Sequence, residues 1–263
     1  MKPLPILISV PHGGNETPKE IADRVCITPK DLFEDSDAFT KEIYGIKNEV
    51  AAWLGADIAR VFIDLNRAEN DLPPNNPDGV VKSLTCHGQP IYSNGWALKA
   101  ENIKTLLQKY YQPYHKKLQT LIKNHIDIRL ALDCHSMEPT GPKIAPDSGK
   151  DRPLLCLSNV NGKSAPDEWM QCLAQCFRES FGLQEGDIAI NKPFVGGYIT
   201  RSYGNHPIPW IQVEMNRKLY LSEPWFNKSS LTVDAPRLKR LREQFKQGLD
   251  KFCHVTFAED RHI

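Results

Sequence analysis

The chain has 263 residues, of which 40% are hydrophobic, and this length and composition suffice for one sizeable core. Its 33 Lys and Arg side chains nearly balance its 32 Asp and Glu side chains, so no excess positive charge favours nucleic acid as a partner. No apolar stretch is long enough to cross a bilayer, and no charged segment with an apolar signal core precedes the first strand-like run. We therefore expect a single cytoplasmic domain over residues 1–263 that binds a small molecule rather than nucleic acid or a membrane, and we leave its oligomeric state open.

Apolar runs alternate with amphipathic segments along the chain. The runs that predict strands are residues 4–10, 56–65, 128–133, 154–158, 194–200 and 208–215. The segments with helical periodicity are residues 35–54, 97–124, 166–181 and 235–253. Such alternation requires crossover connections, which produce parallel strands with helices on both faces. The sequence therefore predicts an α/β fold with three layers, α/β/α, around a mixed, mostly parallel sheet.

The cysteines do not resemble a disulfide framework. There are seven, an odd number, scattered along the chain and mostly within apolar segments. Cys172 and Cys176 are four residues apart, as a ligand pair could be, but they fall within the predicted helix 166–181. We expect reduced thiols that pack in the core.

Two histidines follow apolar runs. His12 comes soon after the run that ends at Val10, and His135 comes soon after the run 128–133. Because ligands of open α/β sheets bind outside the carboxyl ends of the strands, both imidazoles are expected at one edge of the sheet. A hydrogen-bonded or solvated histidine explains either residue singly, whereas the pair at corresponding positions favours a metal site.

A catalytic zinc site normally has three protein ligands and one open position for water, so a carboxylate is expected beside the two histidines. The candidates are Asp35, Asp37 and Glu16. Either of the two aspartates can instead cap the helix predicted after them. Glu16 is close to His12 in sequence but is separated from it by a loop. The residues alone leave the choice open.

Glu214 lies in the last predicted strand, where strand alternation puts Gln212, Glu214 and Asn216 on one side. Burying a carboxylate there is costly without a purpose. Glu214 can act as a general base toward metal-bound water, or it can form a salt bridge with Arg217 or Arg201. We favour the general base.

The run 56–65 leads directly into Asn66 and Arg67. The planar guanidinium of Arg67 can hold a carboxylate through two hydrogen bonds and Asn66 can add another, so the pair is predicted to anchor the substrate. Asp64 is expected to be a buried structural acid that orients Arg67. Polar, Pro-rich loops over residues 70–78 and 138–152 are expected to shape the substrate site.

Arg201 follows a pair of glycines and offers a second guanidinium. We expect it to help stabilise an oxyanion, although a surface salt bridge explains it nearly as well. His87 and His206 lie in loops near Gly and Pro, and for both we expect a solvated side chain.

These segments, taken in order, resemble the N-formylglutamate amidohydrolase family. The blocks that carry the resemblance are residues 9–14 (SVPHGG), 35–37 (DSD) leading to 43–44 (IY), 63–67 (IDLNR), 133–136 (DCHS), 196–201 (GGYITR) and 212–220 (QVEMNRKLY). Each block alone is a weak signal, but the ordered set spans most of the chain.

The resemblance implies a fold of the zinc-carboxypeptidase/phosphorylase type and hydrolysis of an N-acyl amino acid, such as N-formylglutamate to formate and glutamate, in histidine degradation. It implies one zinc ion bound by His12 and His135. Glu214 would be the general base, and Asn66 with Arg67 would bind the substrate carboxylate. For the acidic ligand we prefer Asp37, because the Asp-x-Asp block of the family falls there; Asp35 and Glu16 are the alternatives.

Two other functions fit the same residues. The first is a carboxypeptidase-like or aspartoacylase-like deacylase with another acyl group, because the same metal, base and arginine would serve it. The second is a non-catalytic homologue that binds a metal or ligand. The presence of Glu214 argues against the second, since a pure binding site needs no base beside the metal.

Overall fold

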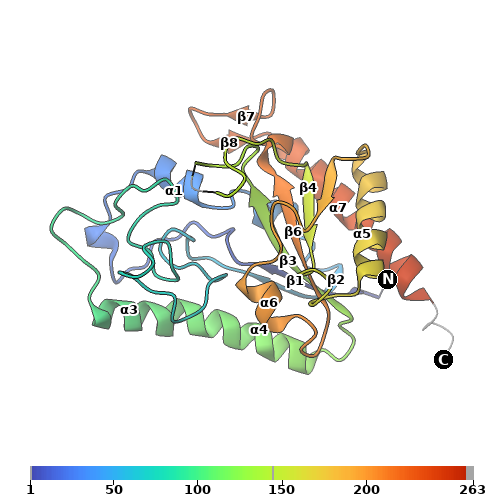
Figure 1. Cartoon of the computed structure of the whole chain (residues 1–263), viewed down its shortest axis with the longest axis horizontal. Helices are drawn as coiled ribbons and strands as arrows, with labels where there is room; N and C mark the ends of the chain where they lie inside the picture. The colour runs from blue at the N-terminus through green and yellow to red at the C-terminus, as the bar shows by residue number, and fades with distance from the viewer. Residues whose placement is uncertain (1, 144, 259–263) are drawn as a thin grey trace.

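A six-stranded sheet forms the centre of the computed structural model, which describes residues 2–143 and 145–258 (Figure 1). Its strands are β1 (Leu4–Val10), β2 (Val50–Gly55), β3 (Leu130–Met137), β4 (Leu155–Ser158), β5 (Ile188–Ile190) and β6 (Trp210–Asn216). They lie in the order β2-β1-β3-β6-β4-β5. All neighbours are parallel except β4 and β6, which are antiparallel. The predicted mixed, mostly parallel sheet is confirmed.

Helices cover both faces of this sheet. In Figure 1, α5 and α7 lie on one side, and the long helix that runs from α3 into α4 lies on the other. The bounds are α5 (Asp167–Phe181), α7 (Ala235–Thr256), α3 (Ala100–Leu106), a π-helical turn η2 (Leu107–Tyr111) and α4 (Gln112–Asn124). The smaller elements are η1 (Ala22–Arg24), α1 (Pro29–Asp35), α2 (Thr40–Ile43), α6 (Tyr198–Tyr203), η3 (Arg217–Leu219) and the hairpin of β7 (Phe226–Asn227) and β8 (Thr232–Val233).

The side chains of β1 divide the core between the two faces. Ile6, Ile8 and Val10 join the hydrophobic cluster that contains α5 and α7, whereas Leu7 joins the cluster that contains α4. The central strand β3 is buried along its whole length. Near-continuous burial is typical of a strand with helices packed on both faces, so the three-layer prediction is confirmed.

The predicted helix over residues 35–54 is wrong. Helix α1 ends at Asp35, α2 is a single turn, and the end of the range is the strand β2. Helix α1 begins earlier because Thr28 and Asp31 form a capping box and Pro29 occupies the first turn. The apolar residues of β2 continue the helical spacing of the preceding segment, but parallel pairing with β1 decides their structure.

Two predicted strands are also wrong. Residues 56–65 are almost entirely buried but fold as turns with isolated bridges, such as Gly14 to Ala59 and Ile63 to Val81. In the range 194–200, Gly196 has a φ of 132° and helix α6 begins at Tyr198. In the first segment the apolar run reflects burial without a strand; in the second, residues 194–198 are only partly buried. The three-residue strand β5 has too short a signal to be predicted.

The other predicted strands and helices are confirmed, and their observed ends differ from the predicted ones by a few residues. The ends of two helices have clear causes: Gly182 closes α5 in the left-handed conformation, and the side chain of Asp234 caps α7 by accepting from the Arg237 N–H. No disulfide joins cysteines among the described residues; Cys134, Cys156, Cys176 and Cys253 are buried as expected, whereas Cys26 is exposed. Within the described residues, no helix has the length and apolar character needed to cross a membrane.

Candidate metal centre

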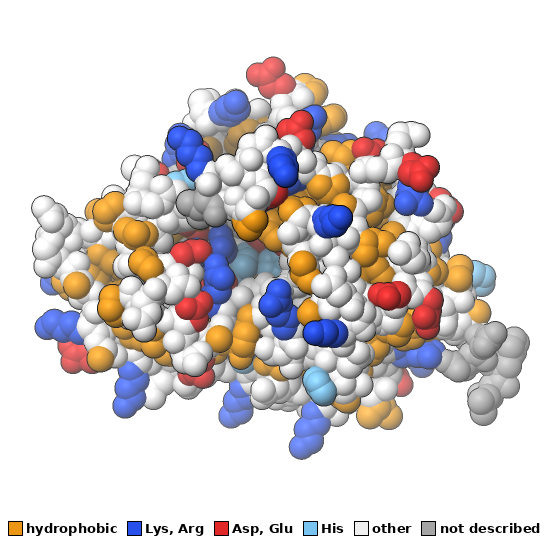
Figure 2. All heavy atoms as spheres, in the orientation of Figure 1, with side chains coloured by type: hydrophobic (Ala, Val, Ile, Leu, Met, Phe, Trp, Pro, Cys, Tyr) orange, Lys and Arg blue, Asp and Glu red, His pale blue; other side chains and the backbone are white. Residues whose placement is uncertain are grey.

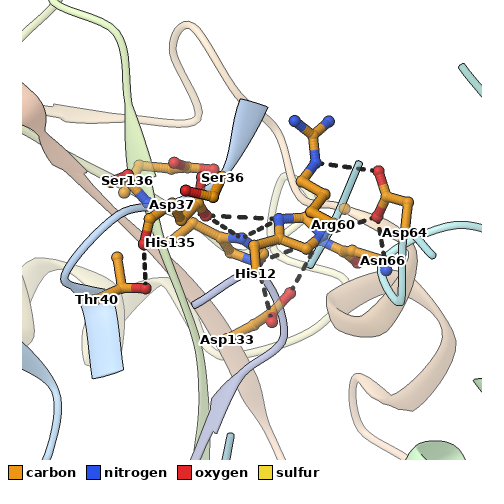
Figure 3. Close-up of polar contacts among 12 residues, drawn as sticks. His12, Ser36, Asp37, Thr40, Arg60, Asp64, Asn66, Asp133, His135 and Ser136 are labelled. Carbon is orange, nitrogen blue, oxygen red and sulfur yellow. Dashed lines mark hydrogen bonds and ion pairs between the residues drawn. The ribbon is translucent and has the colours of Figure 1, made fainter. Parts of the chain in front are cut away.

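The ends of β1 and β3 bring the two predicted histidines together (Figure 3). His12 lies just beyond the end of β1, and His135 lies near the end of β3; the two strands are parallel neighbours. Their Nδ1 atoms are 3.1 Å apart and their ring centroids are 4.7 Å apart. Both side chains are buried, so the two imidazoles face each other in a site shielded from most of the solvent.

Asp37 is the acidic residue that completes this group. Its Oδ2 lies 3.2 Å from His135 Nδ1 and 3.5 Å from His12 Nδ1, and the ligand atoms of the three residues all lie within 4.8 Å of one another. Zinc–nitrogen and zinc–oxygen bonds of about 2.0–2.1 Å in a tetrahedral site put ligand atoms about 3.3 Å apart. The spacing of His12, Asp37 and His135 therefore fits a tetrahedrally bound metal ion with an open fourth position.

The backbone around Asp37 explains why it, and neither alternative acid, reaches the site. The Asp37 N–H donates to His12 O over 3.1 Å, and the Asp37 carbonyl accepts from the Thr40 hydroxyl. Asp35 is also buried, but its carboxylate receives the Cys86 N–H and faces Lys82. Neither aspartate caps a following helix. Glu16 is exposed.

The outer nitrogen of each histidine faces a carboxylate. His12 Nε2 lies 2.8 Å from Asp64 Oδ1, and His135 Nε2 lies 3.0 Å from Asp133 Oδ1. Such a partner holds a proton on Nε2 and leaves the lone pair of Nδ1 for a metal, and it also fixes the orientation of the ring. Both histidines therefore have the arrangement that metal-binding histidines require.

The charges of the group keep the acids ionised. Burial disfavours the charged form of Asp37, but His12 and His135 outweigh it and hold the pKa of Asp37 well below its usual range. Burial likewise opposes the ionised form of Asp64, and His12 and Arg60 hold the pKa of Asp64 well below its usual range. A buried, ionised carboxylate beside two imidazoles is a strong ligand for a divalent cation.

Glu214 lies beside the group on the neighbouring strand. In the parallel pairing of β3 with β6, Glu214 is the register partner of His135. Its carboxylate accepts a hydrogen bond of 2.7 Å from Gln212 Nε2. Burial raises the pKa of Glu214 to about 8, with Asp37 adding to the effect and His135 opposing it. The alternation that put Gln212 and Glu214 on one side is consistent with this contact.

The two arginines that could have paired with Glu214 contact other groups instead. Arg217 donates to Asp37 Oδ1 over 3.2 Å, and Arg201 donates through Nε to the carbonyl of Gly196 over 2.7 Å. Arg201 itself is exposed on α6. Figure 2 shows a hollow on the face of the molecule, with histidine side chains at its floor and both basic and acidic side chains around it.

The predicted substrate anchor is already engaged with protein groups. Asn66 Oδ1 accepts from the Ile199 N–H over 2.7 Å, and Asn66 Nδ2 donates to Asp133 Oδ2 over 3.4 Å and lies 3.2 Å from His135 Nε2. Arg67 donates through Nη2 to Asp78 over 3.0 Å and has its Nε 3.5 Å from Asp64, with 37% of its side chain exposed. Asn66 thus links α6 to the metal centre, while Arg67 stays accessible.

A network of ion pairs that the sequence did not reveal surrounds the buried carboxylates of Asp35 and Asp64. The Lys82 side chain is fully buried, with Nζ 2.5 Å from Asp78 and 3.4 Å from Asp35. Arg60 donates through Nε to Asp64 Oδ2 over 3.2 Å. Charged side chains are rarely buried without partners, but no pattern in the sequence says which ones will meet. His87 and His206 are exposed in loops, as expected.

Comparisons with known proteins show the family of the chain. The model of a family described as N-formylglutamate amidohydrolase matches residues 4–221. The chain is 28% identical over 228 residues to an N-formylglutamate deformylase of Pseudomonas putida, covering 84% of this chain and 83% of the relative. It is 27% identical over 229 residues to one from Pseudomonas aeruginosa, with the same coverage.

Solved structures show the same fold. A crystal structure of N-formylglutamate amidohydrolase from Ralstonia eutropha has a TM-score of 0.81 at 20% identity and covers 98% of this chain and 96% of its own. A gene product of Agrobacterium tumefaciens has a TM-score of 0.65 at 14% identity, covering 94% of this chain and 91% of its own. The family match extends from the start of β1 to beyond β6 and so contains every residue of the metal centre. The chain belongs to the N-formylglutamate amidohydrolase family.

Proposed function

We propose that this protein is a zinc-dependent amidohydrolase that cleaves the amide bond of N-formylglutamate, giving formate and glutamate. One observation carries the proposal: in a member of this family, His12, Asp37 and His135 offer ligand atoms within 4.8 Å of one another. Glu214 lies beside them on the adjacent strand. A metal with a neighbouring carboxylate is the arrangement that hydrolyses amides.

The three ligands would hold one zinc ion through His12 Nδ1, His135 Nδ1 and Asp37 Oδ2. When bound, the ion would act as a Lewis acid and lower the pKa of a bound water toward about 7. Two neutral imidazoles and one carboxylate form a ligand set typical of catalytic zinc sites. The carboxylates of Asp64 and Asp133 keep both rings in the orientation that the ligand set needs.

Glu214 is the proposed general base and acid. It takes a proton from the attacking water and gives that proton to the nitrogen of the departing amino acid. A carboxyl with a raised pKa of about 8 can both accept and return a proton near neutral pH. Gln212 fixes one carboxylate oxygen and so orients the other toward the reacting atoms.

The substrate is proposed to bind through Arg67 and Asn66, with Arg201 stabilising the oxyanion. Arg67 would exchange its contact with Asp78 for a carboxylate of the substrate, which requires only a movement of a partly exposed side chain. Asn66 would act from its fixed position between α6 and His135. The positively charged guanidinium groups of Arg67 and Arg201 favour an anionic substrate.

The proposal also includes a small molecule as the partner and the cytoplasm as the location. A small-molecule substrate accounts for a buried site at the floor of a hollow (Figure 2). The near balance of charges gives no reason to invoke nucleic acid as a partner. A cytoplasmic location is supported by the lack of a disulfide among the cysteines of the described residues, which suits a reducing compartment.

The test combines metal analysis with a substrate screen. Purified protein is analysed for metal, stripped with a chelator, and reloaded with zinc before amine release is measured with N-formyl, N-acetyl and N-succinyl amino acids. We expect one zinc ion per chain, activity that the chelator removes and zinc restores, and the highest kcat/KM with N-formylglutamate. A preference for another acyl group would replace the substrate assignment, and zinc binding without hydrolysis of any of these compounds would overturn the enzyme assignment.

A further inference from the structure

Arg217 follows β6 and is buried against the metal centre, where the proposed function assigns it no role. An arginine near an active site is often taken for a substrate anchor, and such an anchor needs N–H groups that are free to bind. The contacts of its guanidinium decide whether it can be one.

All five N–H groups of the Arg217 guanidinium have acceptors. Nε donates to Ser136 Oγ over 3.0 Å, and Nη1 donates to Glu138 Oε1 and, over 3.3 Å, to Glu34 O. Nη2 donates to Ser36 O over 2.6 Å and to Asp37 Oδ1 over 3.2 Å. Because arginine has five such donors, no donor is left for a substrate. Arg217 is therefore a fixed part of the protein framework.

The two oxygens of Asp37 have different neighbours. Oδ1 accepts from Arg217, whereas Oδ2 accepts from the Ser136 N–H over 3.2 Å and faces the Nδ1 atoms of both histidines. A carboxylate can bind zinc through one oxygen or through both. Only Oδ2 points into the triangle of ligand atoms, because the guanidinium occupies Oδ1.

We propose that Arg217 is a positioning residue that holds Asp37 as a one-oxygen metal ligand and so keeps the fourth position of the metal open. The inference concerns the zinc site of the proposed function and rests on it only for the identity of the metal. Arg217 also joins two segments that carry ligands to the end of β6, because its acceptors lie from the end of α1 to the turn before α2 and at the end of β3. Without the guanidinium, Oδ1 can also turn toward the ion, so that both oxygens crowd the position that water needs and the ion becomes five-coordinate when water binds.

The test uses cobalt in place of zinc, because four-coordinate cobalt(II) absorbs visible light more strongly than five-coordinate cobalt(II). Arg217→Lys keeps the positive charge but removes the planar array of donors. We expect the visible absorption of the cobalt form to weaken and the zinc affinity to fall about 10- to 100-fold. Both readouts are independent of N-formylglutamate hydrolysis, so they stand even where the unaltered protein proves inactive toward that substrate.

The matched control is Arg152→Lys. The Arg152 side chain is equally buried and forms two hydrogen bonds with Asp147, of 2.7 and 3.0 Å. We expect this variant to keep the cobalt spectrum and the zinc affinity of the unaltered protein. An unchanged spectrum in Arg217→Lys, or equal changes in both variants, would overturn the inference.

A crystal structure of the zinc-loaded, unaltered protein decides the question if Arg217→Lys does not fold. The inference requires Oδ2 of Asp37 on the ion and Oδ1 on Arg217. Both oxygens of Asp37 within bonding distance of zinc would contradict it.

Discussion

The two sides of the metal centre are held in place by different forces. On one side, His135 and Glu214 lie on β3 and β6, whose parallel hydrogen-bond ladder sets their register directly. On the other side, His12, Asp37 and Asp64 lie in irregular backbone and depend on ion pairs with buried side chains such as Arg60 and Arg217. The strand side thus follows from backbone pairing, whereas the loop side depends on a charge network that one substitution can break.

The largest effect is expected on the strand side, from Glu214→Gln. The amide keeps the size of the side chain but cannot take a proton from water, so we expect kcat to fall by about 10²- to 10⁴-fold. Zinc content should stay unchanged, because Glu214 is not one of the three ligands. The measurement is formate release together with metal analysis of the same preparation.

The control for that variant is Gln212→Glu, which alters the partner of Glu214 and leaves the base in place. A second carboxylate beside Glu214 should shift the pH profile of kcat rather than abolish turnover. Full turnover by Glu214→Gln would remove this residue from the role of base.

The charge network on the loop side is tested by Lys82→Met. This change removes a buried cation from Asp35 and Asp78, leaving Arg60 as the charged partner of Asp35 and Arg67 as that of Asp78, and we expect the free energy of unfolding to fall by about 3 kcal/mol. Urea unfolding of the metal-free protein measures this change. Lys41→Met is the control, because its ion pair with Asp57 is solvent-exposed and contributes about 0–1 kcal/mol. Equal losses in both variants would show that burial does not matter here.

The same division explains what could be predicted from the sequence. The sequence predicts His12, His135 and Glu214 at one edge of the sheet, because apolar runs mark the strands and the ends of parallel strands meet there. The choice of Asp37 came from the family resemblance, since the residues alone left Asp35 and Glu16 open. The contact of Asp37 with the histidines depends on the turn after α1, where Arg217 meets it from a segment 180 positions away.

The loop side also contains the errors in secondary structure. Residues 56–65 are apolar enough for a strand, but they fold as turns over the charge network. Lys82 reads as a surface residue in any pattern of hydrophobicity, and only the fold brings it beside Asp35. Patterns of hydrophobicity record burial and period, and they carry no information about which charges pair across long distances.

A direct comparison of the two sides uses the carboxylates behind the histidines. Asp133→Asn and Asp64→Asn each remove the charge that faces Nε2 of one ring, and zinc affinity should fall about 10- to 100-fold. We expect the larger loss for Asp64→Asn, because Asp64 also binds Arg60 and the Asn66 N–H, whereas the β3 ladder continues to hold His135 in the other variant. Zinc affinity is measured by competition with a chromophoric chelator. A larger loss for Asp133→Asn would reverse the contrast.

The smallest effect is the pH dependence of zinc binding, which reports on His135. Burial lowers the pKa of this imidazole, but Asp133, Asp37 and Glu214 outweigh it and raise the pKa well above its usual value in the metal-free protein. Below that pKa, zinc must displace a proton from His135, so the affinity should rise about tenfold per pH unit and then become constant above it.

The stability of the metal-free protein should change in the opposite direction. A raised pKa in the folded state means that the ion pairs of His135 stabilise the fold fully below its unfolded pKa of about 6.5, and that this contribution is lost as the pH rises through the folded value. Asp133→Asn removes the largest of the charges that raise the pKa, so both transitions should move to lower pH. Chelator competition and urea unfolding across the same pH range measure the two curves. A zinc affinity that does not depend on pH would contradict the prediction. It would mean that His135 is neutral in the metal-free protein and that the surrounding carboxylates do not raise its pKa.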